Sequence, residues 1–295
     1  MADTGITADE MILMSGTRTL RLWAGRPKPI CYPAGRQVKK VLRRHQRTMR
    51  NSIPRQHSSR RADFWALAFA ICFPSILTWA YFVALSETPT TIQQGVYAAG
   101  KILQFTFPLL FLLLVAREPI LFRWKWRRGL SEGALSGVVI LASILILWQV
   151  LLRAGSPLLA DLVSNVSARI AGLGVVTPWR YFALATFYAI VHTLLEEYYW
   201  RWFVFGRLRR HTGRAVAIGL SSLGFMAHHV IVMGVYAGWT SPYTYLFSLA
   251  VAVGGAYWAW LYERKKTLVA PWVSHFFVDV AIFAIGYALL SQTPR

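Results

Sequence analysis

Charged residues are scarce in this sequence: they make up 15% of its 295 residues, against roughly a quarter in water-soluble domains. Hydrophobic residues make up 56%, which excludes a disordered chain, because such chains lack the apolar residues of a packed core. Cysteine is almost absent, with only Cys31 and Cys72, so neither a disulfide scaffold nor a cysteine-rich metal site is expected. These limits indicate an integral membrane protein, and the 13 Trp and 13 Tyr fit this class because their rings favour the membrane–water interface.

Acidic residues are also few, since 12 Asp and Glu stand against 32 Lys and Arg and give a net charge of +20. Such an excess can indicate nucleic-acid binding, but its distribution indicates membrane topology, and we expect no nucleic-acid partner. Residues 1–62 hold 14 of the basic residues and only three acids, ahead of the first apolar run. We predict a basic, mostly disordered cytoplasmic tail over 1–62 that contacts anionic lipid, followed by a membrane domain over 63–295.

Seven apolar runs are long enough to cross about 30 Å of hydrocarbon at about 1.5 Å per residue. A short extra helix is expected within 157–175, which is apolar but interrupted by glycine. The sequence therefore predicts an all-α fold, a polytopic transmembrane bundle of about seven spanning helices. The runs cover residues 64–85, 94–116, 134–153, 181–205, 215–236, 243–262 and 268–290.

Basic and non-basic segments alternate between these runs without exception. Because basic loops stay on the cytoplasmic side, the amino terminus is predicted to be cytoplasmic and the carboxyl terminus to lie outside. The short loops favour a bacterial protein, and hence the inner membrane. The basic segments are 117–128, 206–214 and 263–266, and the segments with few or no Lys and Arg are 86–93, 154–180 and 237–242.

The fourth run contains ionisable residues, each of which costs about 2.5–3.5 kcal/mol at the centre of a spanning helix. Glu197 and Arg201 are four residues apart and face each other on one helical turn, where an ion pair would lower the cost of burying both. Glu196 lies about 16 Å along the helix from Arg207, near the middle of the membrane. Its only pairing partner on the same helix is His192, one turn earlier. Glu196 is therefore the leading candidate for a chemical role.

The fifth and seventh runs add imidazole groups at overlapping depths. His228 and His229 are adjacent and point about 100° apart, so one of them is expected to reach a shared site. His275 and Asp279 are four residues apart and lie on one face of their helix. If these helices pack together, a glutamate can take a proton from water, and an imidazole held by Asp279 can stabilise an oxyanion.

Two other kinds of chemistry use the same residue types. Zinc could be bound by Glu196, His229 and His275, although the HExxH pattern of many zinc proteases is missing. A proton-coupled transporter or channel could relay protons through these groups, with Lys101, Gln104 and Gln149 along the path. The sequence shows no internal repeat of the kind expected in many transporters.

Three short motifs occur in order, each in its own spanning run. Together they resemble the motifs of the CPBP intramembrane proteases, also called the Abi family, which includes the CAAX prenyl endopeptidases. The resemblance covers residues 180–290, the part of the membrane domain that would form the catalytic core. The motifs are EExxxR at Glu196–Arg201, FxxxH at Phe225–His229 and HxxxN/D at His275–Asp279.

The resemblance implies peptide-bond hydrolysis, without a cofactor, in a polar cavity that opens toward the cytoplasmic side. It implies that Glu196 is the base that activates water and that His229 assists. Glu197 and Arg201 would form a supporting pair, and His228 would have a supporting place beside His229. The implied substrate is a membrane-associated protein or peptide, cut near its carboxyl terminus or in a leader.

The resemblance further implies that His275 and the residue four positions later hold the oxyanion. In prenyl-processing members that later residue is Asn, whereas Asp279, found here, is common in the bacterial branch. Because an ionised Asp would oppose an oxyanion, Asp279 is protonated, orients His275 or acts elsewhere. A non-enzymatic scaffold or bacteriocin-immunity factor on the same fold is a further alternative.

Overall fold

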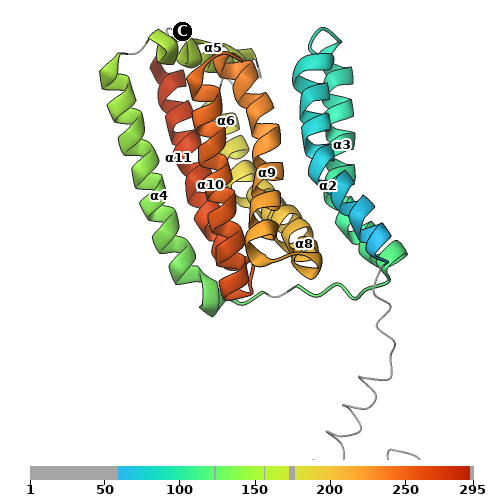
Figure 1. The fold of residues 1–295 in the computed structure, drawn as a ribbon. Coiled ribbons are helices and arrows are strands. Elements are labelled where there is room, and N and C mark those ends of the chain that lie inside the picture. Colours follow the sequence, from blue (N-terminus) through green and yellow to red (C-terminus); the bar gives the residue numbers. More distant parts are fainter. Residues whose placement is uncertain (1–58, 123, 156, 173–176, 293–295) are drawn as a thin grey trace, which may run out of the picture. The chain divides into compact units, whose positions relative to one another are not determined.

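The computed structural model describes residues 59–122, 124–155, 157–172 and 177–292. These residues lie in the second of the two units into which the chain divides, Arg55–Arg295. Nearly all of the basic tail predicted over 1–62 falls outside them, so the tail and its boundary stay predictions. The described residues form helices and no strand, which confirms the predicted all-α fold (Figure 1).

The helices coincide closely with the predicted apolar runs, and α5 is the short extra helix expected within 157–175. They are α2 (Arg60–Trp79), α3 (Thr90–Leu110), α4 (Trp126–Ala154), α5 (Pro157–Gly172), α6 (Pro178–Thr186), α7 (Thr193–Glu197), α8 (Gly206–His211), α9 (Arg214–Ala237), α10 (Pro242–Lys265) and α11 (Val269–Gln292), with π-helical segments at Ala80–Ala84, Phe111–Ala116, Phe187–His192 and Tyr198–Phe205.

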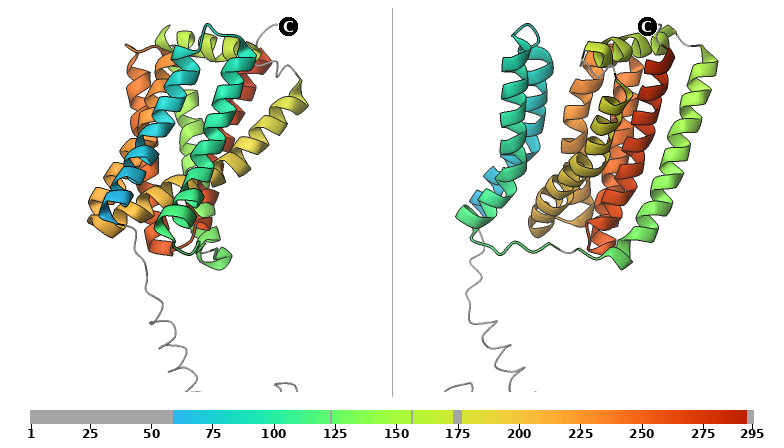
Figure 2. Two further views of the ribbon diagram at one scale, coloured as in Figure 1. Left: turned by 90° about the vertical axis from the view of Figure 1, so that its right-hand side faces the viewer. Right: turned by 180° about the vertical axis from the view of Figure 1, so that it is seen from behind.

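Six helices of the described part have the length and apolar composition needed to cross a bilayer. The remaining predicted span, 181–205, lies within the continuous segment Pro178–His211, which alternates between α and π geometry. Figure 2 shows this segment crossing the other helices at a slant. Its charged residues explain why composition alone does not identify it as a span.

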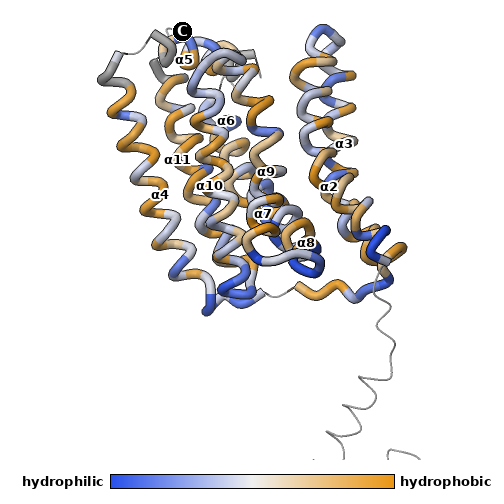
Figure 3. Tube along the Cα trace, in the orientation of Figure 1, coloured by the Kyte–Doolittle hydropathy of each residue, from blue (hydrophilic) through white to orange (hydrophobic). Residues whose placement is uncertain are grey.

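The observed helices extend beyond the apolar runs where the extra residues are polar. α4 begins at Trp126, inside the predicted loop 117–128, and α8 continues through residues of the predicted loop 206–214. The reason is that intrahelical hydrogen bonds need no apolar side chain, so a helix can continue past the hydrocarbon. Figure 3 shows hydrophilic residues gathered at the ends of α4, α8 and α10 that lie on the same side.

α11 is the central helix around which the site is built, and it packs most extensively against α4, which lies along its outer side (Figure 2). Glycines on α4 permit this approach. A Cβ atom at Gly133 would lie 2.5 Å from the carbonyl oxygen of Ala270, and one at Gly137 would lie 2.5 Å from the Phe277 ring. Small residues at such contacts let membrane helices come close together. On its other sides, α11 faces α10 and the slanted segment.

A polar network joins α2, α8 and the connection before α4. Arg207 Nη1 donates to Asp63 at 2.9 Å and to Glu118 at 3.0 Å, and Arg210 donates to Glu118 at 2.7 Å. His211 Nε2 lies 2.6 Å from the second oxygen of Asp63. Although burial raises the pKa of Glu118, its hydrogen bonds and charge interactions with the two arginines lower that pKa overall. The network fixes the end of the slanted segment relative to α2.

Candidate active site

The two adjacent glutamates lie in a short α-helical piece between two π-helical segments. α7 covers Thr193–Glu197, with the π segments Phe187–His192 before it and Tyr198–Phe205 after it. A π segment has a wider turn than an α-helix and changes the direction of the side chains that follow. Accordingly, the hydroxyl oxygen of Thr193 lies 2.9 Å from the carbonyl oxygen of Tyr188, five residues earlier.

Glu197 and Arg201 form the predicted ion pair in the protein interior. Glu197 Oε2 lies 3.0 Å from Arg201 Nε, and the side chains are 0% and 1% exposed. Within the described part of the chain these two atoms form no aligned hydrogen bond, so the contact is an ion pair only. The guanidinium also lies over the rings of Phe225, at 4.8 Å, and Trp258, at 5.3 Å. Together these contacts offset the cost of burying the two charges.

His275 of α11 faces both glutamates. Its Nδ1 lies 2.9 Å from Glu197 Oε1, and its Nε2 lies 3.9 Å from Glu196 Oε2. The imidazole stacks on the Trp258 ring at 3.9 Å between centroids, and Trp258 Nε1 donates to Ser274 Oγ at 3.2 Å. Because a carboxylate only accepts hydrogen bonds, Nδ1 carries the proton in this bond, which leaves Nε2 facing Glu196.

Glu196 lies between imidazoles that come from two different segments. His192 Nε2 is 3.9 Å from one carboxylate oxygen, and His275 Nε2 is 3.9 Å from the other. The charge of Glu196 also interacts with His228 and His229 of α9. Since 3.9 Å exceeds hydrogen-bond distance, these two contacts leave the carboxylate with accepting capacity for another group.

The hydrogen bond of His229 to the backbone determines which of its ring nitrogens carries the proton. Its Nδ1 lies 2.9 Å from the carbonyl oxygen of Phe225, so Nδ1 donates and Nε2 of the neutral ring is an acceptor. His228 stacks parallel to Trp200, with ring centroids 5.9 Å apart, and lies 4.2 Å from the His229 ring. Both imidazoles interact with the charge of Glu196, and the expectation that one of the two reaches a shared site stays a prediction.

Asp279 contacts residues of two different segments. Its Oδ2 accepts a hydrogen bond from the Thr193 hydroxyl at 2.6 Å, while its Oδ1 lies 3.9 Å from His275 Nε2. The short hydrogen bond to His275 comes from Glu197 and not from Asp279, and the role of Asp279 stays a prediction. The four-residue spacing placed Asp279 and His275 on one face, but it carried no information about competing partners on the slanted segment.

Two further residues belong to the surroundings of Glu196. His192 was considered only as a helical neighbour, and its 3.9 Å contact places it beside the carboxylate. The Lys101 ammonium lies over the rings of Tyr97 and Phe105, at 5.4 and 5.6 Å, and it interacts with the charge of Glu196. The position of Lys101 in the middle of a spanning run was the only sequence signal for it.

A metal centre requires several ligating side chains arranged around one point. Among the residues that the structure describes, no group of three or more His, Cys, Asp and Glu side chains is placed to hold a metal ion. The alternative zinc set of Glu196, His229 and His275 is thus not arranged as ligands.

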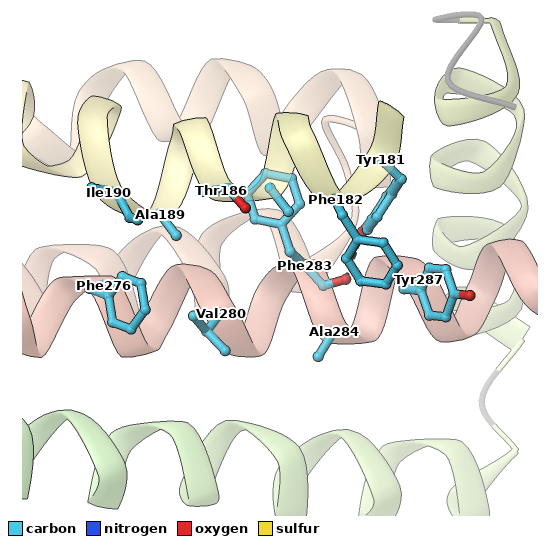
Figure 4. A pocket seen from close by; sticks show the side chains of 11 residues that line it. Tyr181, Phe182, Thr186, Ala189, Ile190, Phe276, Val280, Phe283, Ala284 and Tyr287 are labelled. Atoms are coloured by element: carbon cyan, nitrogen blue, oxygen red, sulfur yellow. Dashed lines mark hydrogen bonds between the residues drawn. The ribbon is translucent and has the colours of Figure 1, made fainter. Parts of the chain in front are cut away.

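An apolar pocket of about 440 Å³ lies alongside the site, between the slanted segment and α11 (Figure 4). Phe276, Val280 and Phe283 line it from α11, and Phe182 and Ile190 line it from the other side. None of the glutamates or histidines discussed above contributes to its lining. The pocket is thus a neighbour of the site and not the site itself.

The fold and the site define a polytopic membrane protein with carboxylates and imidazoles gathered inside its helix bundle. Residues 177–281 match the family model described as Type II CAAX prenyl endopeptidase Rce1-like, which confirms the resemblance predicted from the three motifs. The matched family indicates a protease, and more specifically an intramembrane endopeptidase of the CAAX type. Comparisons with curated proteins and with solved structures gave no match.

Proposed function

We propose that the chain is a glutamate-dependent intramembrane endopeptidase that works without a metal. The supporting observation is the nearly buried carboxylate of Glu196, which lies 3.9 Å from both His192 and His275. Spacings of this size allow water or a substrate oxygen to complete the hydrogen bonds between the groups. The proposed substrate is a membrane-associated protein or peptide, cut near its carboxyl terminus or in a leader.

In the first step, Glu196 takes a proton from water while the water oxygen attacks the carbonyl carbon of the scissile bond. His229 assists because its Nε2 can accept a hydrogen bond from that water. The carbonyl electron pair moves onto oxygen and forms an oxyanion. In its doubly protonated form, His275 donates from Nε2 to this oxyanion while Nδ1 stays bonded to Glu197.

In the second step, the carbonyl re-forms and the bond between carbon and nitrogen breaks. The nitrogen receives the proton held by Glu196, so the products are a carboxyl group and an amine. Glu197 and Arg201 position His275 without contacting substrate. We assign Asp279 a positioning role through its bond to Thr193, which ties α11 to α7, and His228 a supporting role beside His229.

The first prediction concerns Glu196. Glu196→Gln removes the base but keeps the side-chain size, so we expect at least a roughly 100-fold loss of cleavage with normal insertion and expression. The measurement is cleavage of a quenched, prenylated peptide in proteoliposomes, with comparative membrane peptidomics of a deletion strain complemented by each form to find natural substrates. Full activity of the variant would refute the assignment, and a transporter or scaffold would show no Glu196-dependent cleavage at all.

Lys125→Gln, on the exposed connection before α4, is the matched control for Glu196→Gln in this assay. The same assay also tests metal dependence. Activity that persists in EDTA supports the metal-free proposal. Activity that disappears with EDTA and returns with zinc would replace it with a zinc-dependent mechanism.

We further propose that the protein lies in the inner membrane of a bacterium with its amino terminus in the cytoplasm. This rests on the alternation of basic and non-basic segments and on the hydrophilic helix ends in Figure 3. The basic residues of 1–62 are proposed to bind anionic lipid at that membrane surface.

A further inference from the structure

Lys101 is a cation inside a spanning helix that the proposed mechanism does not use. It lies eleven residues after the start of α3 at Thr90, or about 16 Å along the helix. A charge at that depth is costly and is a candidate for function by default. Its ammonium lies over the Tyr97 ring at 5.4 Å and the Phe105 ring at 5.6 Å, and the rings restrain its position through cation–π contacts.

The ammonium borders the site through a short series of contacts. The Phe105 ring packs edge to face against His192 at 6.1 Å, and His192 Nε2 is 3.9 Å from Glu196. The charge of Lys101 interacts with Glu196 and with the imidazole of His229. Lys101 of α3 is thus connected to Glu196 through the Phe105 and His192 rings.

Arg201 and Lys101, the two cations discussed near the glutamates, have different partners. Arg201 is buried and paired with Glu197 at 3.0 Å. In the part of the chain that the structure describes, no carboxylate forms an ion pair with Lys101, although three lie in the site. An ammonium held by rings, with no carboxylate in an ion pair with it, can accept an anionic group from a ligand.

We propose that Lys101 binds a carboxylate of the substrate close to the scissile bond and so determines which peptides are cut. The inference rests on the proposed proteolytic function of the same site. A substrate carboxylate entering near Glu196, Glu197 and Asp279 would be repelled by them, and Lys101 supplies the opposite charge that makes its binding favourable. The carboxylate can be the free carboxyl terminus of the peptide or an acidic side chain near the cut.

The test uses the full-length protein in proteoliposomes and three matched prenylated peptide probes. One probe has a free carboxyl terminus, the second is its carboxyl-terminal amide, and the third replaces an Asp beside the cut by Asn. We expect the unaltered protein to cleave the free acid about 10- to 100-fold more efficiently, in kcat/KM, than the probe that lacks the decisive carboxylate. Slower cleavage of the amide identifies the carboxyl terminus as the group that Lys101 binds, and slower cleavage of the Asn probe identifies the acidic side chain.

The variants then assign this preference to Lys101. The preference is the ratio of kcat/KM for the free-acid probe to kcat/KM for the probe that lacks the carboxylate. We expect this ratio to fall to near one in Lys101→Gln and to persist in Lys101→Arg. It should also persist in Lys125→Gln, which alters an exposed lysine outside the site. An equal loss on all probes in Lys101→Gln would overturn the proposal and indicate a proton-donating role instead. No preference in the unaltered protein would also overturn it.

A binding measurement separates this inference from the proposed function. Glu196→Gln should bind the free-acid probe about 10- to 100-fold more tightly than the charge-neutral probe, and Glu196→Gln combined with Lys101→Gln should not distinguish them. Cleavage without such a preference would contradict the role of Lys101 alone. A lack of Glu196-dependent cleavage would contradict the proposed proteolytic function. Melting temperatures in detergent check that each variant is folded.

Discussion

At the scale of single residues, Glu197 has a second contact besides its ion pair with Arg201. One of its oxygens contacts Arg201 and the other accepts from His275, so it connects the cation to the imidazole. The spacing of Glu197 and Arg201 predicted the first contact, because residues four apart face each other on a helix. The second contact joins residues 78 positions apart in the chain, and no local pattern predicts it.

Removing Arg201 is expected to destabilise the protein. Arg201→Ala leaves the Glu197 charge buried without its cation, a change that costs roughly 3–5 kcal/mol for buried pairs. The melting temperature in detergent should fall by several degrees, with weaker proteolysis as a consequence of a displaced His275. Arg264→Ala, at an exposed site on α10, is the control and should melt like the unaltered protein. An unchanged melting temperature for Arg201→Ala would count against the pair.

At the scale of elements, the slanted segment carries the chemistry, and α11 and α9 bring imidazoles to it. The π segments around α7 change the direction of its side chains, and the apolar pattern gives no sign of them. The close contact between α4 and α11 supports α11 from its outer side. That contact depends on glycines, and sequence spacing alone does not show which helix they face.

Gly133 tests the importance of that contact. In Gly133→Ala the new methyl group would lie 2.5 Å from the backbone oxygen of Ala270, so α4 must move away and stability should fall. At Gly219 of α9 a Cβ meets nothing within 4 Å, so Gly219→Ala should be neutral or raise stability by about 0.5–1 kcal/mol. The comparison is made by thermal unfolding in detergent. Equal behaviour of the two variants would show that the α4–α11 approach contributes little.

At the scale of the whole molecule, orientation decides which side of the membrane supplies the substrate. The basic segments lie next to α4, α8 and the α10–α11 connection, and the non-basic ones lie next to the opposite helix ends. Because basic loops stay in the cytoplasm, the charge pattern predicts the topology of all spans together.

Cysteine labelling checks the orientation. With Cys31 and Cys72 replaced by Ser, Ser86→Cys should react with a membrane-impermeant maleimide in intact cells, because it follows α2 on the non-basic side. Lys125→Cys, on a basic connection, should react only after the membrane is permeabilised. The reverse pattern would invert the proposed topology.

The sequence by itself determined six of the seven predicted spans with their approximate ends, the candidate groups and the Glu197–Arg201 pair. These follow from local physics: apolar runs must be long enough for hydrocarbon, and charges within them need a partner nearby. Only the tertiary structure decided that Glu197 holds His275, that Thr193 engages Asp279, and that Phe105 separates Lys101 from His192. Such contacts join separate helices, and their geometry depends on how those helices turn and pack against one another.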